Sequence, residues 1–163
     1  MITIRNAVAE DLPQLLVIYN DIIANTTAVW HDEPHTLAMR QEWFDVKTEQ
    51  GFPIFVAVEN KIIAGFSTMG PFRPWAGYKF TVENSVYVAA DSRGKGVAKL
   101  LMPPLVEAAK SLGIHAIVAG IEASNEASIA LHEKFGFTEV AHFKEVGFKF
   151  NKWMDLKFLE LIV

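Results

Sequence analysis

The sequence predicts an α/β fold of the α+β kind: one domain with a mixed, mostly antiparallel sheet and helices on both faces. The chain has 163 residues, 51% of them hydrophobic, which is about the size of one domain with a full core. Segments with apolar residues at every second position alternate with segments of helical spacing along most of the chain. Two further alternating segments end the chain and are expected to pair with each other.

The first half of the chain is expected to supply three strands and two helices. Leucine and isoleucine recur at helical spacing in residues 12–24. Thr36 is a favourable N-cap residue, and Asn60 and Lys61 separate two apolar runs as a hairpin turn. The expected elements are strand 2–8, helix 12–24, a helix from Thr36 to about residue 50, and strands 53–58 and 62–69.

The second half is expected to supply four strands and two helices. Pro103 and Pro104 fall inside the first of these helices, where each ring removes a backbone donor and clashes with a carbonyl one turn back. The sequence therefore does not predict whether that helix is straight or kinked. The expected elements are strand 78–88, a helix from a glycine-rich loop to residue 112, strand 114–121, helix 125–135, and strands 137–148 and 152–161.

Residues 85–98 read SVYVAADSRGKGVA: an apolar strand, a polar turn, and the basic, glycine-rich start of a helix. Gly94 and Gly96 lack a Cβ, so the backbone there can approach a ligand closely. A helix that begins near Gly96 would direct unpaired N–H groups at an anion, and Arg93 and Lys95 add positive charge. This order predicts a pyrophosphate-binding loop, and a solvated strand-to-helix turn is the alternative.

Spacing separates three kinds of glycine-rich loop. The P-loop pattern fails because Ala89 stands in place of its first glycine, and the dinucleotide pattern fails because Lys99 stands in place of its last. The third pattern, Arg-x-x-Gly-x-Ala, fits Arg93, Gly96 and Ala98. It resembles the acyl-CoA-binding signature of the GNAT superfamily of N-acetyltransferases.

A second segment, residues 125–137, reads NEASIALHEKFGF and resembles the second GNAT signature, an Asn-capped helix that ends in Gly-Phe. Its local chemistry is consistent with that resemblance. Asn125 is a favourable N-cap, Glu126 lies in the first turn, and Gly136 can supply the left-handed residue after the helix. Two linked signatures in the expected order support each other.

The wider chain resembles a narrower branch, the phosphinothricin acetyltransferases and related bacterial amino-acid N-acyltransferases. The resemblance covers nearly the whole chain and implies a single GNAT domain over residues 1–163. The segments that carry it are residues 25–30 (NTTAVW), 81–83 (TVE), 85–88 (SVYV), 118–122 (VAGIE), 147–150 (GFKF) and 153–156 (WMDL).

Composition excludes several functional classes. Cysteine is absent, which removes disulfides, thiolate zinc sites and any acyl-cysteine intermediate. A net charge of −4 gives no general attraction to nucleic acid or anionic lipid. No apolar run approaches the roughly 20 residues of a membrane span, and the first residues lack a signal-peptide core, so we expect a cytoplasmic protein that binds neither nucleic acid nor membrane.

His31 and His35 flank Pro34, which disfavours a shared helical face, so no metal site is expected.

The resemblance implies acetyl-CoA as the co-substrate. Backbone groups of Val86, Tyr87 and Val88 would hold the thioester and the pantetheine arm if their strand splays from the 114–121 strand, as GNAT strands do. The other expected coenzyme contacts are Arg93, Gly94, Lys95, Gly96, Val97, Ala98, Asn125 and Lys134.

Two residues are candidates for proton transfer. Alternation along the strand places Glu83 on one face with Ser85 and Tyr87, and a partly desolvated carboxylate near the thioester could take the ammonium proton directly or through water. Glu83 also matches the carboxylate of the Thr-Val-Glu motif in relatives, whereas the alternative is a solvated glutamate. His132 stands where many GNAT enzymes carry a tyrosine that protonates the departing thiolate. A histidine there could do the same or assist deprotonation, and the alternative is a structural histidine.

The aromatic loop 71–78 (PFRPWAGY) is the expected wall of the amine pocket. Arg73 offers a planar fork suited to a carboxylate, and Lys79 is a second cation just before Glu83. The alternatives are a surface patch for the loop and simple core for Trp30. The expected amine-binding residues are Trp30, Phe72, Arg73, Trp75, Lys79 and Glu83.

The resemblance predicts acetyl-CoA-dependent N-acetylation of the α-amino group of small amino acids or analogues, by direct attack in a ternary complex. Phosphinothricin, methionine sulfoximine and methionine sulfone are the first substrates to try, and relatives suggest a homodimer. Acetylation of a protein N-terminus or lysine is one alternative, which an exposed peptide groove would favour. A non-catalytic acyl-CoA sensor is another, which coenzyme binding without turnover would favour.

Overall fold

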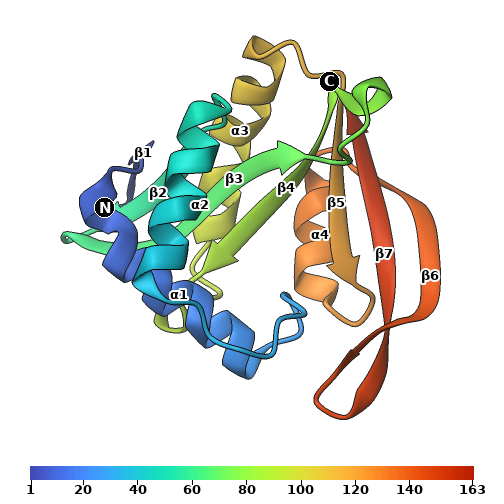
Figure 1. The fold of residues 1–163 in the computed structure, drawn as a ribbon, viewed down its shortest axis with the longest axis horizontal. Coiled ribbons are helices and arrows are strands. Elements are labelled where there is room, and N and C mark those ends of the chain that lie inside the picture. Colours follow the sequence, from blue (N-terminus) through green and yellow to red (C-terminus); the bar gives the residue numbers. More distant parts are fainter.

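A computed structural model describes all of residues 1–163 as one seven-stranded sheet with helices packed on it (Figure 1). The strands are β1 (Thr3–Asn6), β2 (Ile54–Glu59), β3 (Ile62–Pro71), β4 (Thr81–Val88), β5 (Ala116–Glu122), β6 (Thr138–Lys149) and β7 (Lys152–Ile162). The helices are α1 (Leu12–Asn25), α2 (Leu37–Glu49), α3 (Val97–Ser111) and α4 (Glu126–Lys134), with short 3₁₀ turns at Ala9–Asp11, Ala76–Tyr78 and Ala90–Ser92.

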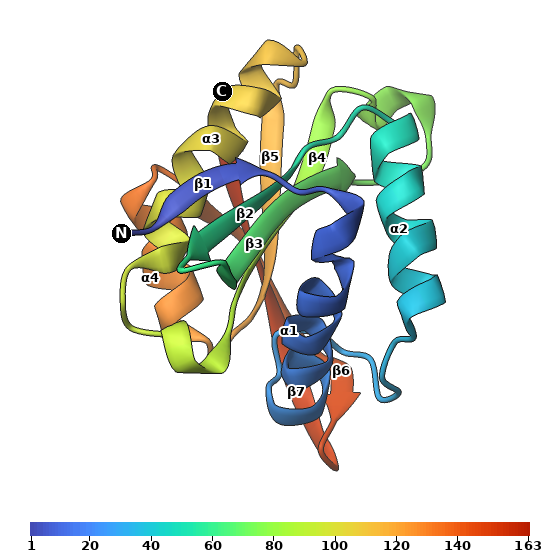
Figure 2. The ribbon, with the colours of Figure 1, turned by 90° about the vertical axis from the view of Figure 1, so that its left-hand side faces the viewer.

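The expected fold class is confirmed. The strand order is β1-β2-β3-β4-β5-β7-β6, and every neighbouring pair is antiparallel except β4 with β5. Figure 2 shows α1 and α2 on one side of the sheet and α3 and α4 on the other. No helix combines the length and the apolar character that crossing a membrane requires.

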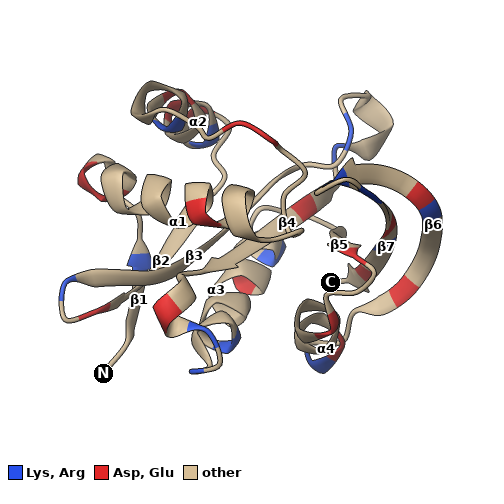
Figure 3. Ribbon diagram, turned by 90° about the horizontal axis from the view of Figure 1, so that it is seen from below, with Lys and Arg blue, Asp and Glu red and all other residues tan.

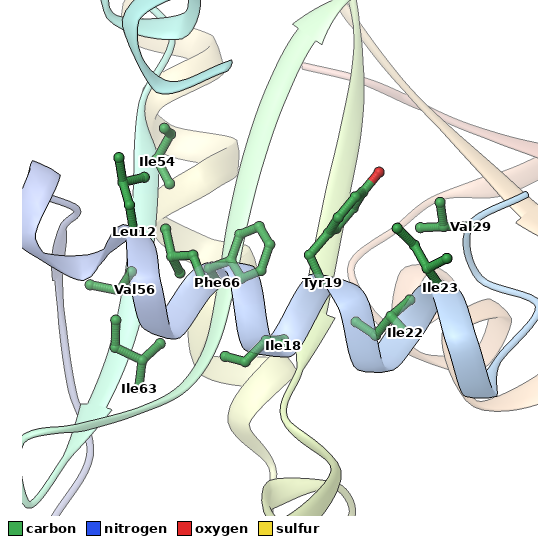
Figure 4. Packing of buried hydrophobic residues seen from close by; sticks show 11 residues of the cluster. Leu12, Ile18, Tyr19, Ile22, Ile23, Val29, Ile54, Val56, Ile63 and Phe66 are labelled. Atoms are coloured by element: carbon green, nitrogen blue, oxygen red, sulfur yellow. The ribbon is translucent and has the colours of Figure 1, made fainter. Parts of the chain in front are cut away.

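Helix α1 covers the first half of the sheet with one apolar face, as its spacing predicts (Figure 4). Leu12 and Leu15 are at most 1% exposed, and their cluster includes Val56 of β2 and Phe66 of β3. Burial of each such side chain contributes about 1.5–3 kcal/mol, so the face fixes the helix firmly. The C-terminal end of α1 is thereby held near the edge of β4.

Two local predictions are confirmed by backbone geometry. Thr36 caps α2, because its Oγ1 accepts a hydrogen bond from the Met39 N–H at 3.2 Å. Asn60 and Lys61 both have positive φ, 51° and 68°, as a two-residue type I′ hairpin turn requires.

The predicted start of the fourth strand at residue 78 is wrong. The Tyr78 N–H donates to the Trp75 carbonyl at 2.9 Å, and the Lys79 N–H donates to the Ala76 carbonyl at 3.2 Å. These bonds form a 3₁₀ turn, so β4 begins only at Thr81. The alternating pattern of residues 78–80 continues that of the strand, which is why sequence alone cannot separate them.

Helix α3 runs through Pro103 and Pro104 without interruption. The rings leave the carbonyls of Lys99 and Leu100, one turn earlier, without their usual helical donors. Both residues are exposed, so water can satisfy these oxygens. The apolar face of α3, which includes the buried Leu101, packs against the sheet regardless.

The parallel pairing of β4 with β5 is very short. It consists of Thr81 with Ala116, Val82 with Ile117 and Glu83 with Val118. Beyond that point β4 pairs only with β3, whereas β5 pairs only with β7. The sheet therefore divides into two halves that separate from Asn84 onward.

Candidate active site

A cavity of about 960 Å³ lies where β4 and β5 separate. Its walls come from the end of β4, the loop before α3, the first turn of α3, helix α4, and residues 26–28 after α1. Ten of the eleven residues expected to contact the coenzyme line it: Val86, Tyr87, Val88, Arg93, Gly94, Gly96, Val97, Ala98, Asn125 and Lys134. The predicted placement requires β4 to splay from β5, and the two strands do separate after Glu83.

The glycine-rich loop presents free backbone donors to the cavity. Gly94 and Gly96 have φ values of 75° and 81°, which glycine adopts far more readily than other residues, and Gly96 is the N-cap of α3. The backbone N–H groups of residues 94–98 form no hydrogen bond within the chain. Together with the positive end of the α3 dipole, they form a site suited to an anion such as a pyrophosphate.

Basic residues lie in this loop, and Figure 3 colours the ribbon blue at Lys and Arg positions near the start of α3. The Arg93 guanidinium is 3.0 Å from the Asp21 carboxylate of α1 and donates through Nε to the Val88 carbonyl at 3.3 Å. Arg93 thus ties the loop to α1 while it lines the cavity. Lys95 is exposed and, alone among the predicted coenzyme contacts, does not line the cavity.

Helix α4 forms the opposite wall of the cavity. Its predicted N-cap is confirmed, since Asn125 Oδ1 accepts a hydrogen bond from the Ser128 N–H at 3.2 Å. Gly136 has a φ of 90° directly after the helix, as its sequence position predicts. Lys134 reaches the cavity from the last turn.

Glu83 lies at the last residue pair that joins β4 to β5. Burial raises the pKa of its carboxyl group above the ordinary value, and the positive charge of Arg73 partly opposes that rise. The carboxylate reaches across to β5, because a Cβ placed on Gly120 would stand only 2.8 Å from Glu83 Oε1. Glu83 is therefore half-buried at the apex of the cleft, beside a glycine that makes room for it.

His132 lies on the other face of β4 and is 4% exposed. Its Nδ1 donates to the Ser128 carbonyl at 2.7 Å, so Nε2 accepts from the Asn84 amide at 3.0 Å. Burial lowers the pKa of the imidazole, although the bond to Ser128 raises it in part. His132 is thus a neutral, fully bonded residue that does not itself line the cavity.

The aromatic loop stands beside Glu83 but is more exposed than a closed pocket wall. Phe72 packs edge-on against Phe158 of β7 at 6.0 Å between ring centroids, and the Arg73 guanidinium lies 5.2 Å from the Phe72 ring. Trp75 is 64% exposed, and the Lys79 ammonium lies over the exposed ring of Phe80. The structure therefore brings Phe72 and Arg73 toward Glu83 and leaves Trp75 and Lys79 at the surface.

Trp30 packs against the far half of the sheet. Its Nε1 donates to the Thr27 carbonyl at 2.9 Å, and its ring covers Gly147 of β6 so closely that a Cβ there would overlap it. It is half-buried and does not line the large cavity.

Several residues around the site were not singled out from the sequence. Gly120 interrupts an apolar strand, and a lone glycine in a strand is the signal for a close approach of another group. Asn84 is another such residue, and its amide forms a hydrogen bond with His132. The burial of Glu122 and Lys149 depends on contacts distant in sequence, because Thr27 lies 95 positions from Glu122 and Ile23 lies 126 positions from Lys149. No group of three or more His, Cys, Asp or Glu side chains forms a metal-binding cluster.

Comparison with known proteins gives this geometry a context. The sequence profile of the acetyltransferase (GNAT) family matches residues 15–137. An L-methionine sulfoximine/L-methionine sulfone acetyltransferase of Pseudomonas paraeruginosa is 46% identical over 160 residues, which cover 98% of this chain and 93% of that protein.

Solved structures agree with this match. The crystal structure of an N-acetyltransferase from Staphylococcus aureus Mu50 superposes with a TM-score of 0.98 at 49% identity, covering 99% of this chain and 98% of that one. A GNAT superfamily phosphinothricin acetyltransferase from Sinorhizobium meliloti, solved in complex with acetyl-CoA, gives 0.96 at 33% identity, covering 99% and 88%.

The glycine-rich loop can be tested with a matched pair of variants. Gly96 and Gly113 both have positive φ, 81° and 71°, and open space where a Cβ would stand, but only Gly96 lines the cavity. Gly96→Val should raise the Kd for acetyl-CoA by about tenfold or more, because its side chain blocks the approach of the pyrophosphate. Gly113→Val imposes similar backbone strain and should leave the Kd unchanged. Calorimetry that gives the same Kd for both folded variants would contradict the assignment of the loop.

Proposed function

Because the chain belongs to the acetyltransferase (GNAT) family, we propose that it transfers an acetyl group from acetyl-CoA to the α-amino group of small amino acids or their analogues. The observation that carries this proposal is the cavity that runs from the anion site of residues 94–98 along residues 86–88, the part of β4 that has separated from β5. Glu83 does not line this cavity; it lies three residues earlier on β4, in the last pair with β5. Methionine sulfoximine, methionine sulfone and phosphinothricin are the proposed substrates to try first, on the strength of the relatives' names.

The coenzyme is proposed to lie along the cavity. The free N–H groups of residues 94–98 suit its pyrophosphate, and the unpaired edge of β4 at residues 86–88 suits the amide groups of its pantetheine arm. Asn125 and Lys134 face this arm from α4. The chain has no cysteine, so the amine attacks the thioester directly and no acyl-thioenzyme forms.

Glu83 is the proposed general base. An amine reaches the site as an ammonium ion and must lose a proton before its nitrogen can attack the thioester carbonyl. Burial raises the pKa of Glu83, which makes its carboxylate a stronger base than a solvated glutamate. The proton passes to Glu83 directly or through one water, and collapse of the tetrahedral intermediate releases the coenzyme as a thiolate.

His132 is proposed to serve the coenzyme side of the reaction. It approaches β4 from the α4 face and meets Asn84, the neighbour of Glu83 and the first residue beyond the paired segment. In the free protein its Nε2 is an acceptor, so it must gain a proton before it can give one to the thiolate. Its two predicted roles, thiolate protonation and assistance in deprotonation, both remain within this proposal.

The amine side is proposed to use Arg73 and the aromatic residues beside it. Arg73 is exposed, acts electrostatically on Glu83, and is the cation that a substrate carboxylate would meet. Phe72 supplies an apolar surface next to it, and Trp30, Trp75 and Lys79 remain proposed outer contacts. A cytoplasmic location is proposed because acetyl-CoA is an intracellular coenzyme.

A homodimer is proposed from the exposed face of the β6–β7 hairpin. β6 is an edge strand, and large apolar side chains that are each between 46% and 62% exposed gather along it and at its turn. Such a long apolar edge is typical of an interface. The residues are Val140, Phe143, Val146, Phe148, Phe150 and Trp153.

The role of Glu83 can be tested by replacing Glu83 itself and by replacing its neighbour Gly120. Glu83→Gln keeps the shape and removes the basicity, so kcat should fall by about 10²–10⁴ with acetyl-CoA affinity little changed. The pH dependence that reports ionisation of Glu83 should vanish, and the deficit should shrink as pH rises because solvent then supplies free amine. Gly120→Ala should also lower kcat, since its Cβ displaces the Glu83 carboxylate.

The two changes share one mechanism, so their combination should be no worse than Glu83→Gln alone. A folded Glu83→Gln variant with near-parental kcat at neutral pH would contradict the proposal that Glu83 is the general base. Additive losses in the double variant would show that Gly120 acts by another route.

A turnover screen tests the substrate class. The protein should acetylate free amino acids and analogues, and Arg73→Ala should raise the KM for amines that carry a carboxylate by about tenfold. The KM of matched amines without a carboxylate should change little. Turnover confined to peptides or protein lysines would favour a protein acetyltransferase, and acetyl-CoA binding without any turnover would favour a sensor.

The dimer can be tested by sedimentation. Trp153→Asp places a charge in the apolar face and should convert a dimer into a monomer. Trp75→Asp is the matched control, because Trp75 is exposed to nearly the same degree, 64% against 62%, on a different surface. A parental protein that sediments as a monomer at micromolar concentration would refute the proposal.

A further inference from the structure

The connection after α1 crosses from one half of the sheet to the other. Helix α1 packs on β2 and β3, but the segment that follows it, residues 26–30, is attached to β5 and β6. The two halves are joined at the narrow end of the cleft by only three pairs of residues. The 26–30 segment joins them again at the wide end, through three separate contacts.

Lys149 makes the first and strongest contact. It is 3% exposed, and its ammonium group donates to three carbonyl oxygens, those of Ile23 at 2.6 Å, Thr26 at 2.9 Å and Val29 at 2.6 Å. No carboxylate lies within salt-bridge distance of it. The carbonyls of Ile23 and Thr26 belong to the C-terminal end of α1, where a cation is favoured by the helix dipole.

Glu122 and Trp30 make the other two contacts. Glu122, at the end of β5, is 7% exposed and accepts from the Thr27 hydroxyl at 3.2 Å and from the Ser124 N–H at 3.1 Å. The Trp30 ring lies against Gly147 of β6, where no other residue would leave room for it. A buried ammonium group, a buried carboxyl group and an aromatic ring therefore hold the segment of residues 26–30 in place.

The same segment is a wall of the coenzyme cavity. Thr26, Thr27 and Ala28 line it together with Val86 of β4 and Ser124 before α4. The wall stands beside the part of the cavity where the proposed function places the pantetheine arm, between the two separated halves. The anion site of residues 94–98 follows β4, and all three hydrogen bonds of Lys149 go to residues 23–29.

We propose that Lys149 is a positioning residue that latches the two halves of the sheet together through residues 26–30 and so sets the width of the pantetheine cleft. The inference rests on the proposed acetyl-CoA site. It adds the contacts that fix the shape of that site. It separates two parts of coenzyme binding: the arm depends on the latch, and the pyrophosphate depends on the glycine-rich loop alone.

This separation gives a direct test. Lys149→Met keeps the length of the side chain and removes its three donors. It should raise the Kd for acetyl-CoA by about tenfold and leave the Kd for 3′-phosphoadenosine 5′-diphosphate, which lacks the pantetheine arm, within about twofold. Lys152→Met, an exposed lysine on the adjacent strand, is the matched control and should change neither Kd.

A second variant guards against loss of folding. Thr27→Val removes the hydroxyl that binds Glu122 and should shift the same ratio of dissociation constants in the same direction, by a smaller factor. Thr48→Val removes a bonded hydroxyl on α2 outside the latch and should not.

Two outcomes would overturn the latch. Equal weakening of both ligands in the latch variants, or a lower Tm with both affinities unchanged, would mean that Lys149 and Thr27 serve stability only. The proposed function has its own test, because a parental protein that fails to bind acetyl-CoA would refute the site itself, whereas parental binding without a change in the ratio refutes only the latch.

Discussion

The short parallel pairing of β4 with β5 is the constraint on which the rest of the site depends. Three residue pairs join the strands, after which each strand keeps only its antiparallel neighbour and one backbone edge of β4 is left without a partner. Unpaired edges inside a sheet are unfavourable unless something occupies them. Here a cavity large enough for an extended coenzyme arm takes the place of the missing strand. Alternation along β4 then places Glu83 on one face of the strand and Asn84 on the other.

Burial acts in opposite directions on the two titratable groups of the site. At Glu83 it raises the pKa, which makes the carboxylate more basic, and the positive charge of Arg73 partly opposes the rise. At His132 it lowers the pKa and keeps the imidazole neutral between Asn84 and Ser128. A tenfold change in proton affinity corresponds to about 1.4 kcal/mol between the two protonation states, so modest differences in burial are enough to alter both groups. Burial is the largest cause of both pKa shifts, and the charge of Arg73 and the hydrogen bond to Ser128 are smaller opposing causes.

The parts of the structure that the sequence predicts are those with local causes. Thr36 and Asn125 cap helices because their side chains reach N–H groups three residues away, and the glycine-rich loop follows from the spacing of Gly94 and Gly96. The start of β4 could not be predicted, because a 3₁₀ turn interrupts an unbroken pattern. Lys149 could not be predicted either. Its surroundings read as an exposed hairpin end, and its acceptors lie 120 to 126 positions earlier.

The energetics of Lys149 explain why a buried cation is suited to hold geometry. Removing an ammonium group from water costs several kcal/mol, whereas each hydrogen bond from a charged donor returns about 1.5–3 kcal/mol. Three such bonds, two of them to carbonyls at the negative end of α1, thus roughly offset the cost, and little net stability remains. The bonds are nevertheless directional, and a displaced carbonyl would leave the charge buried and unsatisfied. A contact of this kind penalises deviation strongly while it contributes little to folding, which is the property that a fixed cleft width requires.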